Sequence, residues 1–291
     1  MEDVDMQKDH ADEDGRSQEH SHHEHESHHH HQNHGAHHHE EPMSQEEVLN
    51  SLLLLGQVAL NAGDYESAVE AYASVLQLEP NETALFNLGS FRARGLGAKQ
   101  DFMEAARLFH QAELLGNDRA GKLCAKCMFD YAHKGFENKT PADLYAAMAV
   151  FVSRVYPEAT EPKQEVIRGL FAIASTHYNR GEYSEAARFF RAAAEFGNDG
   201  YAQYYLAMLY GAGAGVEKND LAALYWLDCA VDNGAADIAL ADRDGMIDAY
   251  RQSLSASEFR ETMMNLSNSC ETGTLDIPVN PDKAARWGEA S

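Results

Sequence analysis

A two-helix unit recurs along this chain, and the recurrence constrains the fold more than any other feature of the sequence. In Tyr201–Gly234, two apolar stripes at helical spacing predict two helices. Three glycines between them, Gly211, Gly213 and Gly215, end the first helix and allow the chain to reverse. Such a unit is too small to bury its own apolar face, so its copies have to stack on one another.

Three further copies share the internal spacing of this unit. A shift of 118 residues superimposes it on residues 84–116. The coinciding positions, in order, are Gly95, Gly97, Asp101, Ala105, Leu108, Ala112 and Gly116 with Gly213, Gly215, Asn219, Ala223, Trp226, Ala230 and Gly234. The other two copies keep their offsets at Ala186, Phe189, Ala193 and Gly197, and at Ile277, Asn280, Ala284 and Trp287. The recurrence predicts a helical repeat protein.

These residues carry a family resemblance. The pattern A…LG/A..Y..G.GV..(D/N)...A..W...A...G resembles the Sel-1-like repeat, a relative of the tetratricopeptide repeat. Leu49–Glu82 is similar to a tetratricopeptide repeat proper, although Ala59 and Val75 depart from its commonest choices. The positions that carry this second likeness are Leu52, Leu55, Gly56, Ala68, Tyr72 and Pro80. The resemblance implies an all-α, right-handed α-solenoid of about six stacked antiparallel helix pairs. It also implies an adaptor or scaffold with no catalytic residues.

Two parts of the chain are expected to differ in structure: a tail, residues 1–44, and the solenoid, residues 45–291. The expected helix pairs lie near residues 45–82, 83–116, 118–156, 162–197, 198–234 and 235–288. The last pair should be atypical, because the end of a solenoid has to present a polar face to water. We expect one helix over Ala235–Asn265, a polar loop to Pro281, and a short closing helix over Lys283–Trp287.

The tail has a composition unlike the rest of the chain. It holds 13 of the 16 histidines and twelve Asp or Glu, with only Lys8 and Arg16 as basic residues. So few apolar residues cannot form a core, and we expect disorder. Imidazoles and carboxylates are ligands for Zn²⁺, Ni²⁺, Co²⁺ and Cu²⁺. The candidate metal ligands are His22, His23, His25, His28, His29, His30, His31, His34, His37, His38 and His39.

A metal role is not the only interpretation of the tail. The same composition fits a solubilising low-complexity arm, or in part an affinity tag, although the interspersed Glu, Ser, Gln and Asn disfavour a simple tag. No cofactor is expected to be required, and Zn²⁺ or Ni²⁺ on the tail is the candidate bound ion. Because flexible sites select metals poorly, storage, buffering or delivery fits better than catalysis.

Charge and hydropathy exclude several classes of partner. A formal net charge of −24 disfavours nucleic acid and anionic membrane surfaces, which need a basic face, and favours basic partners. No apolar run is long enough to cross a membrane, so membrane insertion is not expected. The acidic, polar N-terminus is unlike a secretory signal, and four cysteines make no dense framework. The expected location is the cytoplasm.

Few residues of the solenoid could carry chemistry. Cys124 and Cys127 form a CxxC motif on a predicted helix, where buried packing is the expected role and metal or redox use the alternative. His110, His133 and His177 are isolated and expected at the surface or facing a loop. No paired carboxylates, GxSxG or HExxH arrangement appears, so no catalytic or cofactor-binding residues are expected.

The expected function is therefore a non-enzymatic scaffold that binds a partner peptide or protein in the groove of the array. In tetratricopeptide arrays the first helix of each pair lines that groove. By this resemblance, the candidate partner-binding residues at the N-terminal end are Asn50, Leu53, Gln57 and Leu60. Tyr204 lies off the main apolar stripe and is a fifth candidate, whereas Tyr201, Tyr205, Tyr210 and Tyr225 are expected mostly in the core. The alternative is a metal-buffering or metal-delivery protein whose repeats dock on the recipient.

Overall fold

The computed structural model describes residues 42–135 and 139–290, and these contain thirteen α-helices, one π-helical turn and no strand. The candidate metal ligands between residues 22 and 39 lie outside the described residues. In chain order the helices are α1 (Gln45–Ala62), α2 (Tyr65–Leu78), α3 (Glu82–Arg94), α4 (Phe102–Leu114), α5 (Ala120–Gly135), α6 (Pro141–Val155), α7 (Pro162–Asn179), α8 (Tyr183–Ala192), α9 (Gly200–Ala212), α10 (Asp220–Asp232), α11 (Ala236–Ser253), α12 (Ala256–Thr272) and α13 (Pro281–Glu289). The π-helical turn η1 (Ala193–Gly197) extends α8.

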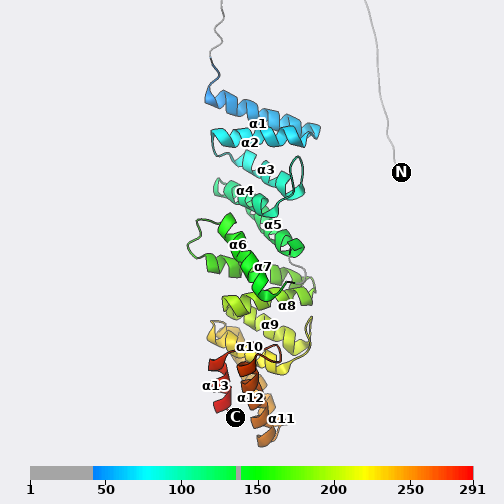
Figure 1. Ribbon diagram of the computed structural model, residues 1–291, viewed down its shortest axis with the longest axis vertical. Coiled ribbons are helices and arrows are strands. Elements are labelled where there is room, and N and C mark those ends of the chain that lie inside the picture. The colour runs from blue at the N-terminus through cyan, green and yellow to red at the C-terminus, as the bar shows by residue number, and fades with distance from the viewer. Residues whose placement is uncertain (1–41, 136–138, 291) are drawn as a thin grey trace, which may run out of the picture. The chain divides into compact units, whose positions relative to one another are not determined.

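Helices that follow one another in the chain pack on one another, mostly as pairs (Figure 1). The pairs are α1 with α2, α3 with α4, α7 with α8, α9 with α10, and α12 with α13. Between pairs, α2 packs on α3 and α8 packs on α9. This arrangement confirms the expected all-α fold of stacked helix pairs.

A glycine on the first helix of a pair lets the second helix approach closely. A Cβ added at Gly56 of α1 would lie 2.8 Å from the ring of Tyr72 on α2. The equivalent Gly89 of α3 would place a Cβ 3.0 Å from the ring of Phe109 on α4. Both rings are fully buried, so each glycine makes room for a large apolar side chain in the centre of its pair.

A glycine in the loop within a pair joins that pair to the one before it. Gly97, with φ of +61°, would place a Cβ 2.3 Å from the carbonyl oxygen of Tyr65 at the start of α2. Gly215, with φ of +72°, would place a Cβ 2.3 Å from the backbone of Tyr183 and Ser184 at the start of α8. Only glycine fits both the left-handed conformation and the space, which explains why these two positions coincide in the repeat.

Two segments differ from the expected helix pairs. The segment 118–156 contains α5 and α6, but α5 packs mainly on α4, while α6 packs on α4, α7 and α8. The segment 235–288 contains three helices, because the helix expected over Ala235–Asn265 breaks at Leu254 and Ser255. Ser255 and Glu258 form a capping box that begins α12 there. In consequence α12 pairs with α13, and α11 packs mainly on α10.

Candidate partner-binding surface

The four candidate partner-binding residues near the N-terminus lie on α1. Asn50 and Gln57 are exposed, and Leu53 and Leu60 are partly buried against the core. The Gln57 amide donates a hydrogen bond of 2.9 Å to Asn61 on the same helix. These side chains border one face of α1, and α1 packs on α2.

Tyr204, the fifth candidate, lies on α9, which packs on α8, η1 and α10, so the structure does not bring it together with the α1 residues. Its hydroxyl donates a hydrogen bond of 3.1 Å to Asp242 on α11. The pKa of Tyr204 is raised because its hydroxyl is partly buried and faces that carboxylate. Tyr210 and Tyr225 are core residues as expected, but Tyr201, in the first turn of α9, is 45% exposed.

Tyr204 belongs to a cluster of six rings, the α7–α9 aromatic cluster. Its members are Phe171, Tyr178, Tyr183, Phe190, Tyr204 and Tyr205. Tyr205 is central: its ring stacks on Phe190 at 5.1 Å and meets Tyr178 edge-on at 5.5 Å. Only Phe190 is fully buried, so the other five rings are partly open to solvent. Sequence reasoning assigned Tyr205 to the core, because its helical spacing fits either location.

A groove of 470 Å³ lies beside this cluster, between α9, α10 and α11. Its lining is mostly small and apolar: Ala207, Met208, Gly211, Ala212, Ala223, Leu227, Ala241, Gly245 and Met246, with Asp242 as the charged member. Alanine and glycine leave the space open, and Met208 and Met246 provide flexible apolar side chains on its two sides. Sequence reasoning missed this α9–α11 groove, because its second wall is α11, which lies outside the repeat pattern.

The exposed side of α11 is acidic. Asp237, Asp242, Asp244 and Asp248 are all exposed, whereas its two arginines are engaged with carboxylates. Of these aspartates Asp242 lines the α9–α11 groove, and a charge at the edge of an apolar groove acts mainly on the rate and selectivity of association. The groove is therefore suited to apolar side chains that are flanked by basic ones.

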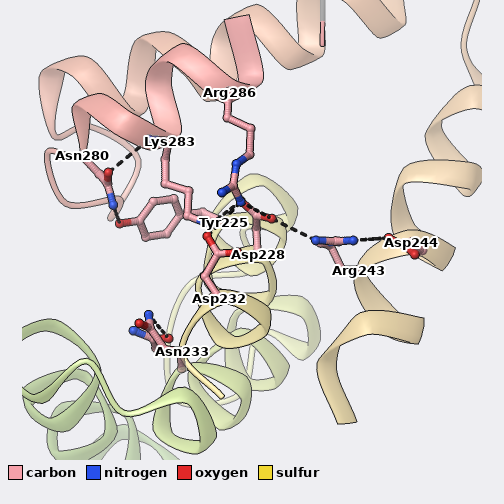
Figure 2. A network of polar contacts seen from close by, with 10 residues as sticks. Tyr225, Asp228, Asp232, Asn233, Arg243, Asp244, Asn280, Lys283 and Arg286 are labelled. Carbon is pink, nitrogen blue, oxygen red and sulfur yellow. Dashed lines mark hydrogen bonds and ion pairs between the residues drawn. The ribbon is translucent and has the colours of Figure 1, made fainter. Parts of the chain in front are cut away.

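A buried charge cluster joins the last helix pair to α10 (Figure 2). Asp228 of α10 is 2% exposed and receives Lys283 Nζ at 2.5 Å and Arg286 Nη1 at 3.1 Å, both from α13. Arg243 of α11 reaches the same carboxylate from the opposite side at 3.2 Å. Asp232, one helical turn along α10, shares Lys283 at 2.7 Å and Arg286 at 2.9 Å.

The charges in this cluster balance. Three carboxylates, including Asp244 paired with Arg243 at 2.8 Å, face one lysine and two arginines. Burial raises the pKa of Asp232, but the hydrogen bonds and charges of Lys283 and Arg286 bring it below its ordinary value. Sequence reasoning found no paired carboxylates; Asp228 and Asp232 are such a pair, and both form ion pairs with Lys283 and Arg286. The cluster therefore fits a structural role better than acid–base chemistry.

Three of the remaining chemical candidates, Cys124, Cys127 and His177, are buried packing residues, whereas His133 is exposed as expected. Cys124 and Cys127 are buried on α5, and burial raises the pKa of Cys127 to about 12, so its thiolate is disfavoured. His177 is fully buried, which corrects the surface position expected for it: its ring stacks on Phe189, and its Nδ1 lies 2.6 Å from Glu182.

Within residues 42–135 and 139–290, no group of three or more His, Cys, Asp or Glu could hold a metal ion. No helix in this part of the chain is long and apolar enough to cross a membrane.

Comparisons with known proteins agree with this repeat architecture. A model described as Sel1 repeat matches residues 83–117, 200–234 and 260–291, and one described as tetratricopeptide repeat matches residues 49–82. The third Sel1 match covers most of α12 and all of α13, the pair that the charge cluster joins to α10. Among proteins of curated function, none matches the chain.

Three solved structures share the likeness at low identity. The protective antigen c5321 of uropathogenic Escherichia coli, which displays an SLR fold, is 21% identical, with 82% of this chain and 52% of that chain covered and a TM-score of 0.27. A Sel1 repeat protein from Oxalobacter formigenes is 20% identical, with 82% and 95% covered and a TM-score of 0.23. A sel1 repeat protein from Klebsiella pneumoniae is 19% identical, with 68% and 92% covered and a TM-score of 0.27. The chain thus spans about half the length of the Escherichia coli protein. Helix pairs, glycine positions and repeat matches together show that this chain contains Sel1 repeats and a tetratricopeptide repeat.

Proposed function

We propose that this protein is a non-enzymatic scaffold that binds a partner protein on the surface formed by the α7–α9 aromatic cluster and the α9–α11 groove. Sel1 and tetratricopeptide repeats generally serve as protein-binding scaffolds, so the repeat matches support a protein as partner. The observation that carries the choice of surface is the concentration of partly exposed aromatic and methionine side chains there.

The composition of this surface resembles the centre of a protein interface. Aromatic residues and methionine are enriched in interfaces, and tyrosine is a frequent source of binding energy. Tyr178, Tyr204 and Tyr205 offer apolar rings with hydroxyl groups, and their mutual contacts hold the rings in place before a partner arrives. Asn50, Leu53, Gln57 and Leu60 remain proposed contacts toward the N-terminal end of the array.

Site-specific photo-crosslinking tests this surface. A photoreactive amino acid at position 208 or 246 should crosslink a partner in cells, whereas the same group at Leu114, which is 66% exposed on α4, should not. Met208→Asp should abolish the crosslink from position 246, and Leu114→Asp should leave it intact. Equal crosslinking from positions 208 and 114 would contradict the proposal.

A second proposed function, metal handling by the tail, is favoured by the 13 histidines among residues 1–44. We propose that the tail binds divalent transition metals such as Zn²⁺ or Ni²⁺ and that the repeats dock on a protein that receives the metal. Equilibrium dialysis with zinc should show binding to the full chain and none to a chain that begins at Ser44. If the protein is a scaffold, the shortened chain should still capture its partner. If the protein delivers metal, removal of the tail should alter the metal content of the cell.

A further inference from the structure

The outer face of α1, made by Ser51, Leu54, Leu55 and Val58, is apolar and uncovered. Leu54 is 65% exposed, Leu55 is 54% exposed and Val58 is 56% exposed. Their spacing of three and four residues places them in one stripe along the helix. This stripe lies on the side away from Gly56, the residue that contacts α2 through Tyr72.

The equivalent stripe on the next pair is a helix-packing face. A shift of 33 residues superimposes Gly56 on Gly89, and both contact an aromatic ring of their partner helix. The same shift carries Ser51, Leu55 and Val58 of the outer face onto Ala84, Leu88 and Phe91 of α3. These three are 0%, 8% and 3% exposed, because α2 packs on α3 and its Tyr72 ring lies 6.2 Å from Phe91. The outer face of α1 therefore has the chemistry of a surface that receives another helix.

The chain itself offers little to cover this face. Residues 1–41 contain no Leu, Ile, Phe, Tyr or Trp. At the other end of the array, α13 exposes Asp282, Arg286 and Glu289, so a head-to-tail contact between copies would bury charges against leucine. A covering helix has to come from elsewhere and has to be apolar.

Charge favours a second copy of the chain as that occupant. Residues 48–63 contain no ionisable side chain, although 24% of the chain is Asp, Glu, Lys or Arg. Two outer faces can thus meet without opposing like charges, in a protein whose formal net charge is −24. A helix of another protein that binds through charged side chains would meet no opposite charge on this face.

We propose that two copies pair through the outer faces of α1, antiparallel, about a two-fold axis near Leu54 and Leu55. Residues 1–41 carry twelve acidic and two basic side chains and join α1 at its start. A parallel pair would bring these two junctions together. In an antiparallel pair they lie about 27 Å apart along an 18-residue helix, about three Debye lengths at physiological salt. This pairing goes beyond the proposed scaffold function and leaves the α9–α11 groove free.

Sedimentation equilibrium of the full chain over a wide concentration range tests the pairing. The chain should reach twice its monomer mass, and the double variant Leu55→Glu and Val58→Glu should weaken self-association at least tenfold. Circular dichroism of the variant should remain helical, because both side chains are exposed in the monomer. Leu114→Glu, at an equally exposed leucine of α4, is the matched control and should still dimerise. A chain that stays monomeric throughout would overturn the proposal.

Disulfide trapping tests the orientation. In the antiparallel pair, Ser51 of one copy faces Val58 of the other, whereas the two Ser51 positions are offset by about 10 Å along the axis. A disulfide requires Cα atoms within about 7 Å. A mixture of Ser51→Cys and Val58→Cys chains should therefore crosslink on oxidation, and Ser51→Cys alone should not. The four native cysteines are buried and do not compete. Crosslinking of Ser51→Cys alone would overturn the antiparallel arrangement.

Discussion

At the scale of single residues, the most demanding feature is the buried Asp228 carboxylate. It is 2% exposed and accepts hydrogen bonds from Lys283, Arg286 and Arg243, which come from two different helices. A buried charge is tolerated only when its partners are in place, so each of these contacts fixes the position of α13 or α11 on α10. The cluster therefore determines where the last helix pair packs on α10, in addition to stabilising that packing.

Removal of the Asp228 carboxylate should leave the buried Lys283 ammonium without its nearest partner. Asp228→Ala should lower the free energy of unfolding by about 3–5 kcal/mol, as expected when one member of a buried pair is lost. Asp248→Ala, where a 62% exposed carboxylate pairs with an equally exposed arginine, should change it by less than about 0.5 kcal/mol. Urea denaturation of the two variants measures the difference, and equal losses would argue against a buried cluster.

Asp232 makes the stability depend on pH in the acid range. Its pKa lies below the ordinary 3.8 in the folded protein, so its contribution is complete above that value and is lost as the pH falls through the folded pKa. Asp232→Asn should therefore be less stable than the native chain at pH 5, and the gap should narrow as the pH approaches 3. Chemical denaturation at a series of pH values measures the difference in free energy of unfolding between the two chains. A difference that widens on acidification would contradict this prediction.

Leu275 carries backbone strain in the loop before α13. Its φ is +56°, a left-handed conformation that is unfavourable for a leucine, and its side chain is 51% exposed. Leu275→Gly should raise the free energy of unfolding by about 0.5–1 kcal/mol, because the relief of strain exceeds the entropic cost of glycine. A rise in the midpoint of thermal unfolding is the expected readout, and a fall would mean that the leucine makes a contact worth more than its strain.

At the scale of elements, caps decide where helices begin. Ser255 accepts a hydrogen bond from the Glu258 backbone, and the Glu258 carboxylate accepts one of 2.8 Å from the Ser255 backbone. This reciprocal pair starts α12 at Ala256, directly after Leu254 has capped the end of α11. The same device, Ser44 with Glu47, starts α1. The pKa of Glu258 is lowered because the Ser255 hydroxyl and backbone N–H donate hydrogen bonds to its carboxylate.

Loss of this cap should destabilise α12. Ser255→Ala should cost about 1 kcal/mol of unfolding free energy. Ser253→Ala, which removes a hydroxyl bonded to the Ala249 carbonyl inside α11, should cost less. Chemical denaturation followed by circular dichroism compares them, and the Glu258 pKa measured by NMR should rise toward its ordinary value only in the first variant.

At the scale of the whole molecule, stability comes from contacts between adjacent pairs. Gly215 places the loop of the α9–α10 pair against the start of α8, and the Ser184 hydroxyl donates a hydrogen bond of 3.1 Å to its carbonyl oxygen. Gly97 makes the equivalent approach to the start of α2. Because these two junctions join a pair to the one before it, a defect at either junction should spread mainly to the pairs beside it.

Alanine substitution at two glycines with nearly the same φ distinguishes the effect of this close contact on stability from the effect of backbone strain. Gly215→Ala adds a Cβ 2.3 Å from the backbone of α8 at φ of +72°, and should lower the unfolding free energy by about 2–4 kcal/mol. Gly181→Ala, at φ of +74° with nothing within 4 Å, should cost only about 1 kcal/mol. Hydrogen exchange should show the larger loss of protection in α7–α10. Equal effects of the two variants would contradict a close junction at Gly215.

The sequence by itself determined the helical repeat. Glycines that recur at fixed offsets, such as Gly97 and Gly215, report local backbone conformations and close approaches that every copy of the unit needs, so the pattern is visible without coordinates. Apolar periodicity likewise identified core residues such as Tyr210 and Trp226.

Tertiary structure alone decided the features that occur once. The break at Ser255, the burial of His177 and the Asp228 cluster depend on side chains far apart in the chain: Lys283 lies 55 residues from Asp228. The α9–α11 groove depends on where α11, a helix outside the repeat, packs on α10. Periodicity records which side of a helix is apolar. What lies against that side is set by contacts between distant segments, and a local pattern contains no record of them.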